Sequence, residues 1–344
     1  MKLKNHVYSV SKKTGKTLLR FVFLLVLTDI LVIFFPDELQ KIVQELKNTS
    51  LQVLAAVLLL ALLRFFLEGA IIRTAVGNSG ETSITLKKGI CCAFYCEFFR
   101  LFTLGTGSGI AEIYYLSENG LEPVRGTGIS LIQYTLHKLA ITLCGIVSLI
   151  LCRQELHQSL DSRRGAVLGG CLLALAICAV ILLAAACRPL SRFLFSLAEK
   201  PAQHLGGQWP EKLNRLEQQT ELLQTESCLL LHEKKRLFGL FLLNLLKFGC
   251  LYMIPRATFP PGSISPEKSW ALCALVYLLA GVIPAPSGYG STEFLFLMLY
   301  SPFTGTARAG AAAVLLRIAT SFFPAAIGGI IFLFQKKNTP DVRG

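Results

Sequence analysis

The sequence predicts an all-α, polytopic membrane protein with about six full spans and two re-entrant helical hairpins in an inverted repeat. Of its 344 residues, 53% are hydrophobic and only 16% are charged, whereas a soluble domain is about 25% charged. Apolar runs of about 18 or more residues recur, each long enough to cross a hydrocarbon layer of roughly 30 Å. Two further apolar stretches are interrupted by clusters of glycine.

The net charge of +13 has two possible explanations, nucleic-acid binding or a membrane topology. We favour the second, because Lys and Arg gather in the cytoplasmic loops of membrane proteins, and we expect no bound nucleic acid. The eleven cysteines lie almost all inside apolar runs such as "GICCAFYCEFF" and lack the paired spacing of zinc sites. They are interpreted as small apolar fillers, and no metal and no cofactor are expected.

The first span is expected at 18–35 and is interpreted as retained in the mature protein. It could be mistaken for a secretory signal, because five lysines precede it and Arg20 lies at its start. The run is longer than a typical signal core, however, and "FFPDELQ" offers no small-residue cleavage site. The chain 1–344 is therefore treated as a single integral membrane domain.

The other elements follow in chain order. Full spans are expected at 51–72, 126–152, 165–187, 237–255 and 306–333, and broken apolar stretches at 88–118 and 269–300. A polar, cytoplasmic linker at 188–236 carries leucines at helical spacing. It is either an amphipathic helix at the membrane surface or a plain connector.

The basic residues predict the orientation. With both termini in the cytoplasm, they outnumber those on the outer side by roughly three to one, as is typical of a bacterial-type inner (plasma) membrane protein. This count requires each broken stretch to enter and leave by one face, 88–118 from the cytoplasm and 269–300 from outside. Non-helical backbone at membrane depth must be covered by protein or a wet cavity, so the two stretches are expected to meet near the midplane.

An internal repeat accompanies these breaks. Both contain Gly-x-Gly-x-x-Glu, and a basic residue precedes and follows each at a similar distance. The matched residues are Arg64, Gly107, Gly109, Glu112 and Lys138 in the first unit, and Lys247, Gly288, Gly290, Glu293 and Arg317 in the second. The units, about 51–152 and 237–333, have opposite predicted orientations, which is the pattern of transporters with inverted repeats and broken helices. The motif is not a dinucleotide fingerprint, because no strand precedes it.

The chemistry expected at the breaks is anion binding. Glycines let the backbone turn and expose its amides, and the following helix, beginning near Ile110 or Ser291, directs its positive end into the protein. Each glutamate either caps that helix or pairs with a cationic head group or a buried arginine. Arg317 has no charged neighbour in sequence, so Glu293 is its expected partner.

Other polar residues of the apolar runs have simpler interpretations. Arg64 and Glu68, four apart, could pair on one helix face, as could Glu97 and Arg100, three apart. His137 is interpreted as a hydrogen-bonded interior histidine. No nucleophile lies beside a base, so no catalytic residue is expected.

Three segments carry a family resemblance. They are "LFTLGTGSGIAEIYYLSENGLEPVRGTGISLIQYTLHKLAI", "VIPAPSGYGSTEFLF" and "LLRIATSFFPAAIGG". Together they resemble the transmembrane domain of lysylphosphatidylglycerol synthases over nearly the whole chain. The Pro-x-Pro, glycine and glutamate motif is fairly specific, whereas the first break has Leu104 and Gly105 where the family usually has proline.

The resemblance implies a division of labour. In the two-part enzymes the membrane domain flips the aminoacylated lipid, and a soluble domain transfers lysine from lysyl-tRNA to phosphatidylglycerol. Only "QKKNTPDVRG" follows Phe334 here, so we expect this chain not to transfer lysine by itself. A separate soluble transferase is a possible partner.

The functional hypothesis is a translocase for anionic or aminoacylated phospholipid, or for another lipid-linked head group. The alternatives are a membrane subunit of phosphatidylglycerol lysyltransferase, acting in lipid lysylation and cationic peptide resistance, and a regulatory protein of cell-envelope synthesis. The expected head-group site comprises Gly107, Gly109, Glu112, Pro284, Pro286, Gly288, Gly290, Glu293 and Arg317, supported by Arg64, Arg100, Lys138 and Lys247.

Overall fold

The computed structural model describes residues 36–77, 84–105, 107–151, 233–283, 285 and 288–338, together with scattered helical positions between 165 and 224. The expected span 18–35 lies outside the described residues. The expected span 165–187 and the linker 188–236 are described only at the scattered positions, so they stay predictions.

Every element of the described chain is a helix, which confirms the all-α fold. In order they are α2 (Pro36–Lys47), α3 (Leu51–Val76), α4 (Leu86–Phe102), α5 (Ser108–Glu118), α6 (Pro123–Leu151), α11 (Lys234–Thr258), α12 (Pro266–Ala280), α13 (Ser291–Thr304), α14 (Thr306–Arg317), the π-helical turn η3 (Ile318–Phe322) and α15 (Phe323–Asn338). Among the described residues, four stretches are long and apolar enough to cross a membrane: Leu51–Val76, Pro123–Leu151, Lys234–Thr258 and Thr306–Gln335. The protein is therefore a multi-pass α-helical membrane protein.

The first broken stretch forms a helical hairpin, as the glycines predict. Helix α4 begins where the Thr85 hydroxyl accepts a hydrogen bond from the Lys88 amide at 3.3 Å. It ends at Phe102, because Leu104 (φ 50°) and Gly105 (φ 95°) turn the chain into the left-handed region. The Thr103 hydroxyl then accepts from the Gly107 amide at 2.7 Å, so α5 begins at Ser108, two residues before the expected Ile110.

The second broken stretch is also a hairpin of two helices. Ser265 caps α12 by accepting from the Lys268 amide at 3.3 Å, and the helix ends before Gly281. The chain turns at Gly288 (φ 72°) and Gly290 (φ 81°), conformations that glycine adopts without a steric penalty. Helix α13 then begins at Ser291, as expected.

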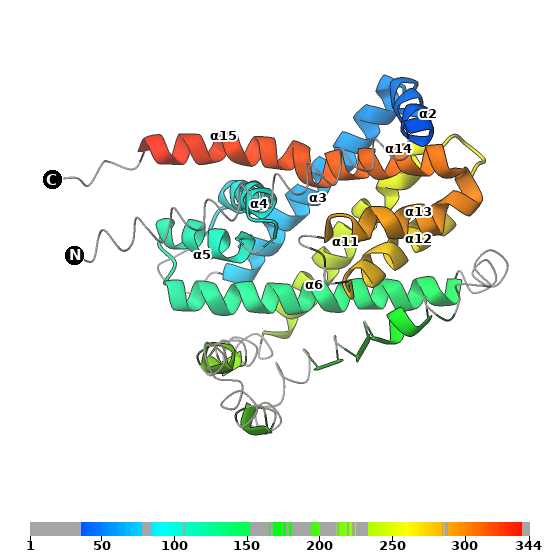
Figure 1. Ribbon diagram of the computed structural model, residues 1–344. Coiled ribbons are helices and arrows are strands. Elements are labelled where there is room, and N and C mark those ends of the chain that lie inside the picture. The colour runs from blue at the N-terminus through cyan, green and yellow to red at the C-terminus, as the bar shows by residue number, and fades with distance from the viewer. Residues whose placement is uncertain are drawn as a thin grey trace.

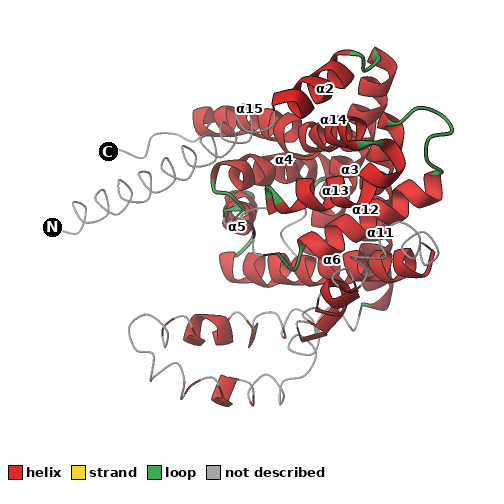
Figure 2. Ribbon diagram, turned by 45° about the vertical axis from the view of Figure 1, so that its right-hand side comes forward, coloured by secondary structure: helices red, strands yellow, loops and turns green. Residues whose placement is uncertain are grey.

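The two hairpins pack at opposite ends of α6. Near the start of α6, Gly126 lies against Ile113 of α5, and near its end Gly145 lies against Leu278 of α12. Likewise α4 packs against α15, and α13 packs against α14. Both ribbon views show hairpin α4–α5 beside the later part of the last helix and hairpin α12–α13 beside its earlier part, with α3 and α11 crossing between (Figures 1 and 2).

The core is divided in the same way. One buried cluster surrounds the first hairpin and includes Phe65, Tyr95 and Leu116. The other surrounds the second hairpin and includes Leu272 and Phe296. Each hairpin thus has its own apolar packing.

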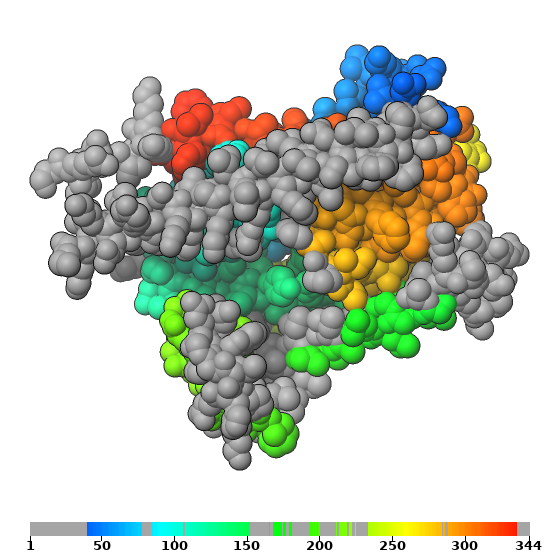
Figure 3. Space-filling model, viewed as in Figure 1, coloured from blue at the N-terminus to red at the C-terminus, as the bar shows by residue number. Residues whose placement is uncertain are grey.

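The outer surface is apolar where a membrane would contact it. Phe294 on α13 is 62% exposed and Leu333 on α15 is 66% exposed. The side chains of α12 and α13 contribute to the orange and yellow surface of the space-filling view (Figure 3). Exposed apolar surface of this extent is costly in water but suits contact with lipid tails.

Helix α2 is an element that the sequence interpretation missed. It begins at Pro36, a residue well suited to the first turn of a helix, and it packs against α14. Ile42 fills the space beside Gly310, and Arg308 Nε lies 3.6 Å from Glu45 Oε1. Its sequence, PDELQKIVQELK, is too short and too polar to predict a membrane span.

Candidate functional site

Glu293 and Arg317 join the tip of the second hairpin to the last span. Arg317 Nε donates to Glu293 Oε1 at 2.5 Å, and Arg317 Nη2 donates to the Gly288 carbonyl at 3.1 Å. The Gly290 amide donates to Glu293 Oε2 at 2.8 Å. The expected pair is therefore confirmed, and the glutamate also caps α13, so both of its interpretations hold.

Tyr289 completes the surroundings of the arginine. Its ring centroid lies 4.5 Å from Arg317 Cζ, a distance at which a cation is attracted to an aromatic face. The side chains of Arg317 and Glu293 are 15% and 33% exposed. The Arg317 guanidinium thus contacts the Glu293 carboxylate, the Gly288 carbonyl and the Tyr289 ring. Together these contacts hold the hairpin tip against α14.

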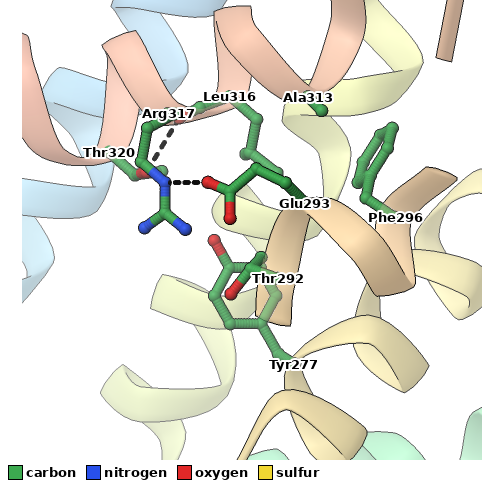
Figure 4. Close-up of a pocket in the computed structure, with 8 residues that line it drawn as sticks. All are labelled: Tyr277, Thr292, Glu293, Phe296, Ala313, Leu316, Arg317 and Thr320. Carbon is green, nitrogen blue, oxygen red and sulfur yellow. Dashed lines mark hydrogen bonds and ion pairs between the residues drawn. The ribbon is translucent and has the colours of Figure 1, made fainter. Parts of the chain in front are cut away.

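A small cavity lies behind the ion pair (Figure 4). Its volume of ≈ 10 Å³ is about what one water molecule requires. Tyr277 directs its ring and hydroxyl toward the pair from the opposite side (Figure 4). The lining residues are Tyr277, Thr292, Glu293, Phe296, Ala313, Leu316, Arg317 and Thr320. A phosphate head group does not fit unless the hairpin tip moves away from α14.

The last span changes its winding directly after Arg317. Residues Ile318–Phe322 form a π-helical turn, a feature often found at functional sites. Pro324 follows, and proline has no amide hydrogen to give to the carbonyl four residues earlier, which is that of Thr320. Arg64 Nη1 of α3 lies 3.5 Å from this carbonyl oxygen.

Glu112, the counterpart of Glu293, has different partners. Its two oxygens accept hydrogen bonds from Ser130 Oγ at 2.9 Å and Gln133 Nε2 at 2.7 Å, both on α6. Lys138 instead lies over the ring of Tyr134, with Nζ 5.4 Å from the centroid. The similarity of the two sequence motifs thus does not extend to their partners, which are neutral donors for Glu112 and an arginine for Glu293.

The remaining glycines of the motif lie at the start of α5, just after the turn at Leu104 and Gly105. Gly107 precedes the first turn of α5, and Gly109 lies beside Ser130, one of the donors to Glu112. Lys138 reaches the other hairpin, because a methyl group on Gly281 would lie 3.7 Å from its Nζ. Pro284 and Pro286 lie outside the described residues.

A second ion pair connects α3 with α11. Lys247 Nζ lies 3.0 Å from Glu68 Oε2 and 3.1 Å from His137 Nδ1, and Lys247 is only 1% exposed. The expected pairing of Arg64 with Glu68 is wrong, because α11 packs along α3 and places Lys247 closer to the carboxylate. His137 is hydrogen-bonded, as expected.

Arg100 pairs with Glu97 within α4, Nη1 to Oε2 at 3.2 Å, as their spacing predicted. Among the described residues, no group of three or more His, Cys, Asp and Glu side chains could hold a metal ion. The chemistry that these side chains offer to a ligand is charge pairing and hydrogen bonding, by the cations Arg317, Lys247 and Arg100 and the carboxylates paired with them.

Several polar contacts were not predicted. Tyr289 lies inside the motif "SGYGSTE" and could have been singled out by that position. Tyr277, Thr320, Ser130 and Gln133 are neutral residues within apolar runs, and no sequence signal separates them from ordinary packing residues. Their roles depend on which helix each one faces.

Comparison with known proteins identifies the family. The family described as "Lysylphosphatidylglycerol synthase TM region" matches residues 18–328, which is most of the chain and includes both hairpins and most of the last span. No curated protein matches the chain significantly. The chain belongs to the family of the lysylphosphatidylglycerol synthase transmembrane region.

Proposed function

We propose that this protein moves a phospholipid, of the anionic or aminoacylated phosphatidylglycerol type, from one leaflet of the membrane to the other. The observation that carries the proposal is the Glu293–Arg317 pair, which closes a hairpin tip over a cavity of ≈ 10 Å³. Ionisable groups within membrane helices usually mark a pathway for a charged ligand. Membership of a lipid-modifying family supports association with lipid.

The arrangement of the hairpins supports alternating access. They pack against opposite ends of α6, as re-entrant hairpins entering from opposite faces would. On this basis 51–152 and 237–333 are inverted repeats, with the site at their interface. Rocking one repeat against the other would open the site first to one leaflet and then to the other.

The chemistry of the pair suits a head group that carries both charges. When the site opens, the side chains of Arg317 and Glu293 separate. Both charges would then be uncompensated at membrane depth, which is unfavourable. A lipid with a phosphate and an amine supplies an opposite charge to each ion, so it would stabilise the open site. The amine would bind Glu293, and the phosphate would lie near the arginine side chain and the amides at Gly288 and Gly290.

Reconstitution into liposomes tests this function. The vesicles would contain a trace of fluorescent phosphatidylglycerol or lysylphosphatidylglycerol, and dithionite would bleach the label in the outer leaflet. We expect bleaching to exceed the outer-leaflet fraction with the wild type and to stop at that fraction in protein-free vesicles and with Glu293→Gln. Wild-type vesicles that bleach only the outer leaflet with both lipids would contradict the proposal.

A further inference from the structure

The cations of the described membrane helices differ in how they are compensated. Arg317 contacts Glu293, Lys247 contacts Glu68 and Arg100 contacts Glu97. Arg64, in the middle of α3, has no carboxylate within 4.0 Å among the residues that the structure describes. It is therefore the arginine of the central region whose charge is not matched by an ion pair.

The hydrogen bonds of Arg64 are also incomplete. A guanidinium carries five N–H donors. Nη1 lies 3.5 Å from the Thr320 carbonyl, and the guanidinium lies 4.7 Å from the ring of Phe65. Nε is buried and has no hydrogen-bond partner in the described part of the chain. An arginine at membrane depth with one long hydrogen bond is energetically costly, and such residues usually have a function.

Arg64 adjoins the site already described. The side chain of Thr320 lines the cavity behind Glu293 and Arg317, and its carbonyl is the one that Arg64 approaches. Pro324 supplies no amide to the Thr320 carbonyl four residues earlier, and the Arg64 guanidinium donates to that oxygen instead.

We propose that Arg64 is a second cation that binds the phosphate of the transported lipid, and that it binds the phosphate first, because Glu293 and Gly288 hold Arg317 until the site opens. This inference rests on the proposed function and adds an anion-binding residue to it. The fork of N–H groups on a guanidinium matches two phosphate oxygens. In the described part of the chain Arg64 makes one long hydrogen bond and no ion pair, whereas Arg317 already contacts Glu293 and Gly288. The ligand class assigned to Arg64 is therefore a lipid with a phosphodiester, and a neutral lipid without phosphate is not expected to bind there.

A binding experiment tests the assignment without requiring movement. Detergent-purified wild type, Arg64→Gln, Arg64→Lys and the control Arg73→Gln would be titrated with phosphatidylglycerol or diacylglycerol and examined by native mass spectrometry. Arg73 lies on the same helix but is exposed. We expect Arg64→Gln to lose about tenfold or more in phosphatidylglycerol affinity, as for a charge-assisted hydrogen bond. Arg64→Lys should lose less, and Arg73→Gln should behave as the wild type.

Thermal unfolding separates ligand binding from a structural role. Without lipid, Arg64→Gln should unfold at the wild-type temperature or above it, because an incompletely bonded charge is removed. Arg317→Ala should have a lower unfolding temperature than the wild type. Added phosphatidylglycerol should raise the unfolding temperature of the wild type and leave that of Arg64→Gln unchanged.

Three results would overturn the assignment. They are wild-type affinity of Arg64→Gln for phosphatidylglycerol, equal binding of diacylglycerol by the wild type, and lipid-free destabilisation of Arg64→Gln equal to that of Arg317→Ala. Phosphatidylglycerol binding that depends on Arg64 but is not accompanied by movement would contradict only the proposed function. Movement that persists in Arg64→Gln with wild-type binding would contradict only the role of Arg64.

Discussion

Glu293 combines a structural and an electrostatic role in one side chain. One oxygen accepts from the Gly290 amide and caps α13, and the other accepts from Arg317. A neutral amide could replace the first contact but not the charge of the second. The two roles can therefore be separated by substitution.

We expect Glu293→Gln to abolish lipid movement while leaving expression near normal, because the amide oxygen still caps α13. Arg317→Ala should reduce both lipid movement and expression, because it removes the contacts to Glu293, Gly288 and Tyr289. Breaking a buried ion pair typically costs about 3–5 kcal/mol of folding stability. The dithionite assay measures movement, and the monodisperse yield in size-exclusion chromatography measures folding. Full transport by Glu293→Gln would leave Glu293 as a cap only.

The Lys247–Glu68 pair is predicted to be structural. Lys247→Met leaves the partly buried carboxylate of Glu68 unpaired and should lower the free energy of unfolding by about 3 kcal/mol. The double variant Lys247→Met with Glu68→Gln should recover a large part of this loss, because neither remaining group is charged. A double-mutant cycle on unfolding free energies measures the coupling, and additive single effects would contradict it.

At the scale of elements, close helix packing depends on glycine. Gly328 of α15 lies so near α4 that a methyl group would collide with the Phe94 carbonyl oxygen. Small residues allow such an approach between membrane helices. The contact holds the last span against the first hairpin.

Gly328→Ala should therefore destabilise the protein by about 1–3 kcal/mol, as overpacking typically does. The control is Gly249→Ala within α11, where nothing lies within 4 Å of the added methyl group. That variant should be neutral or more stable, by up to about 1 kcal/mol, because alanine favours helix. Thermal unfolding of the two variants in the same detergent compares them, and equal unfolding temperatures would show that α15 and α4 are not tightly packed.

At the scale of the whole molecule, the basic residues and the two hairpins predict one topology. This topology places the junction of α5 and α6 on the cytoplasmic side and the start of α12 on the outer side, which stays a prediction. Glu122 and Glu267 are exposed at these two places. They provide matched positions for a test of sidedness.

In a variant without its eleven native cysteines, Glu122→Cys should react with a membrane-impermeant maleimide only in inside-out vesicles. Glu267→Cys should react only in right-side-out vesicles or intact cells. Labelling of both positions from the same side would contradict the inverted orientation of the two repeats, and with it the proposed alternating access. The test does not depend on knowing the lipid.

The sequence by itself determined the membrane class, both chain breaks and two ion pairs, Glu293–Arg317 and Glu97–Arg100. Apolar runs and scarce charge are averages over many residues, so they predict the environment whatever the packing. Gly288 and Gly290 act locally through their own backbone conformations, and α13 begins at Ser291 as expected. Arg317 had no charged neighbour in sequence, which pointed to Glu293.

Only the tertiary structure decided the other partners. Glu68 pairs with Lys247 instead of Arg64, Glu112 takes Ser130 and Gln133, and Arg64 faces the carbonyl of Thr320. Local spacing predicts which residues share a helix face, but it does not predict which neighbouring helix that face meets. A membrane helix that is apolar on all sides has no polar face to set its rotation, so close packing of small residues and a few interhelical polar contacts set it instead.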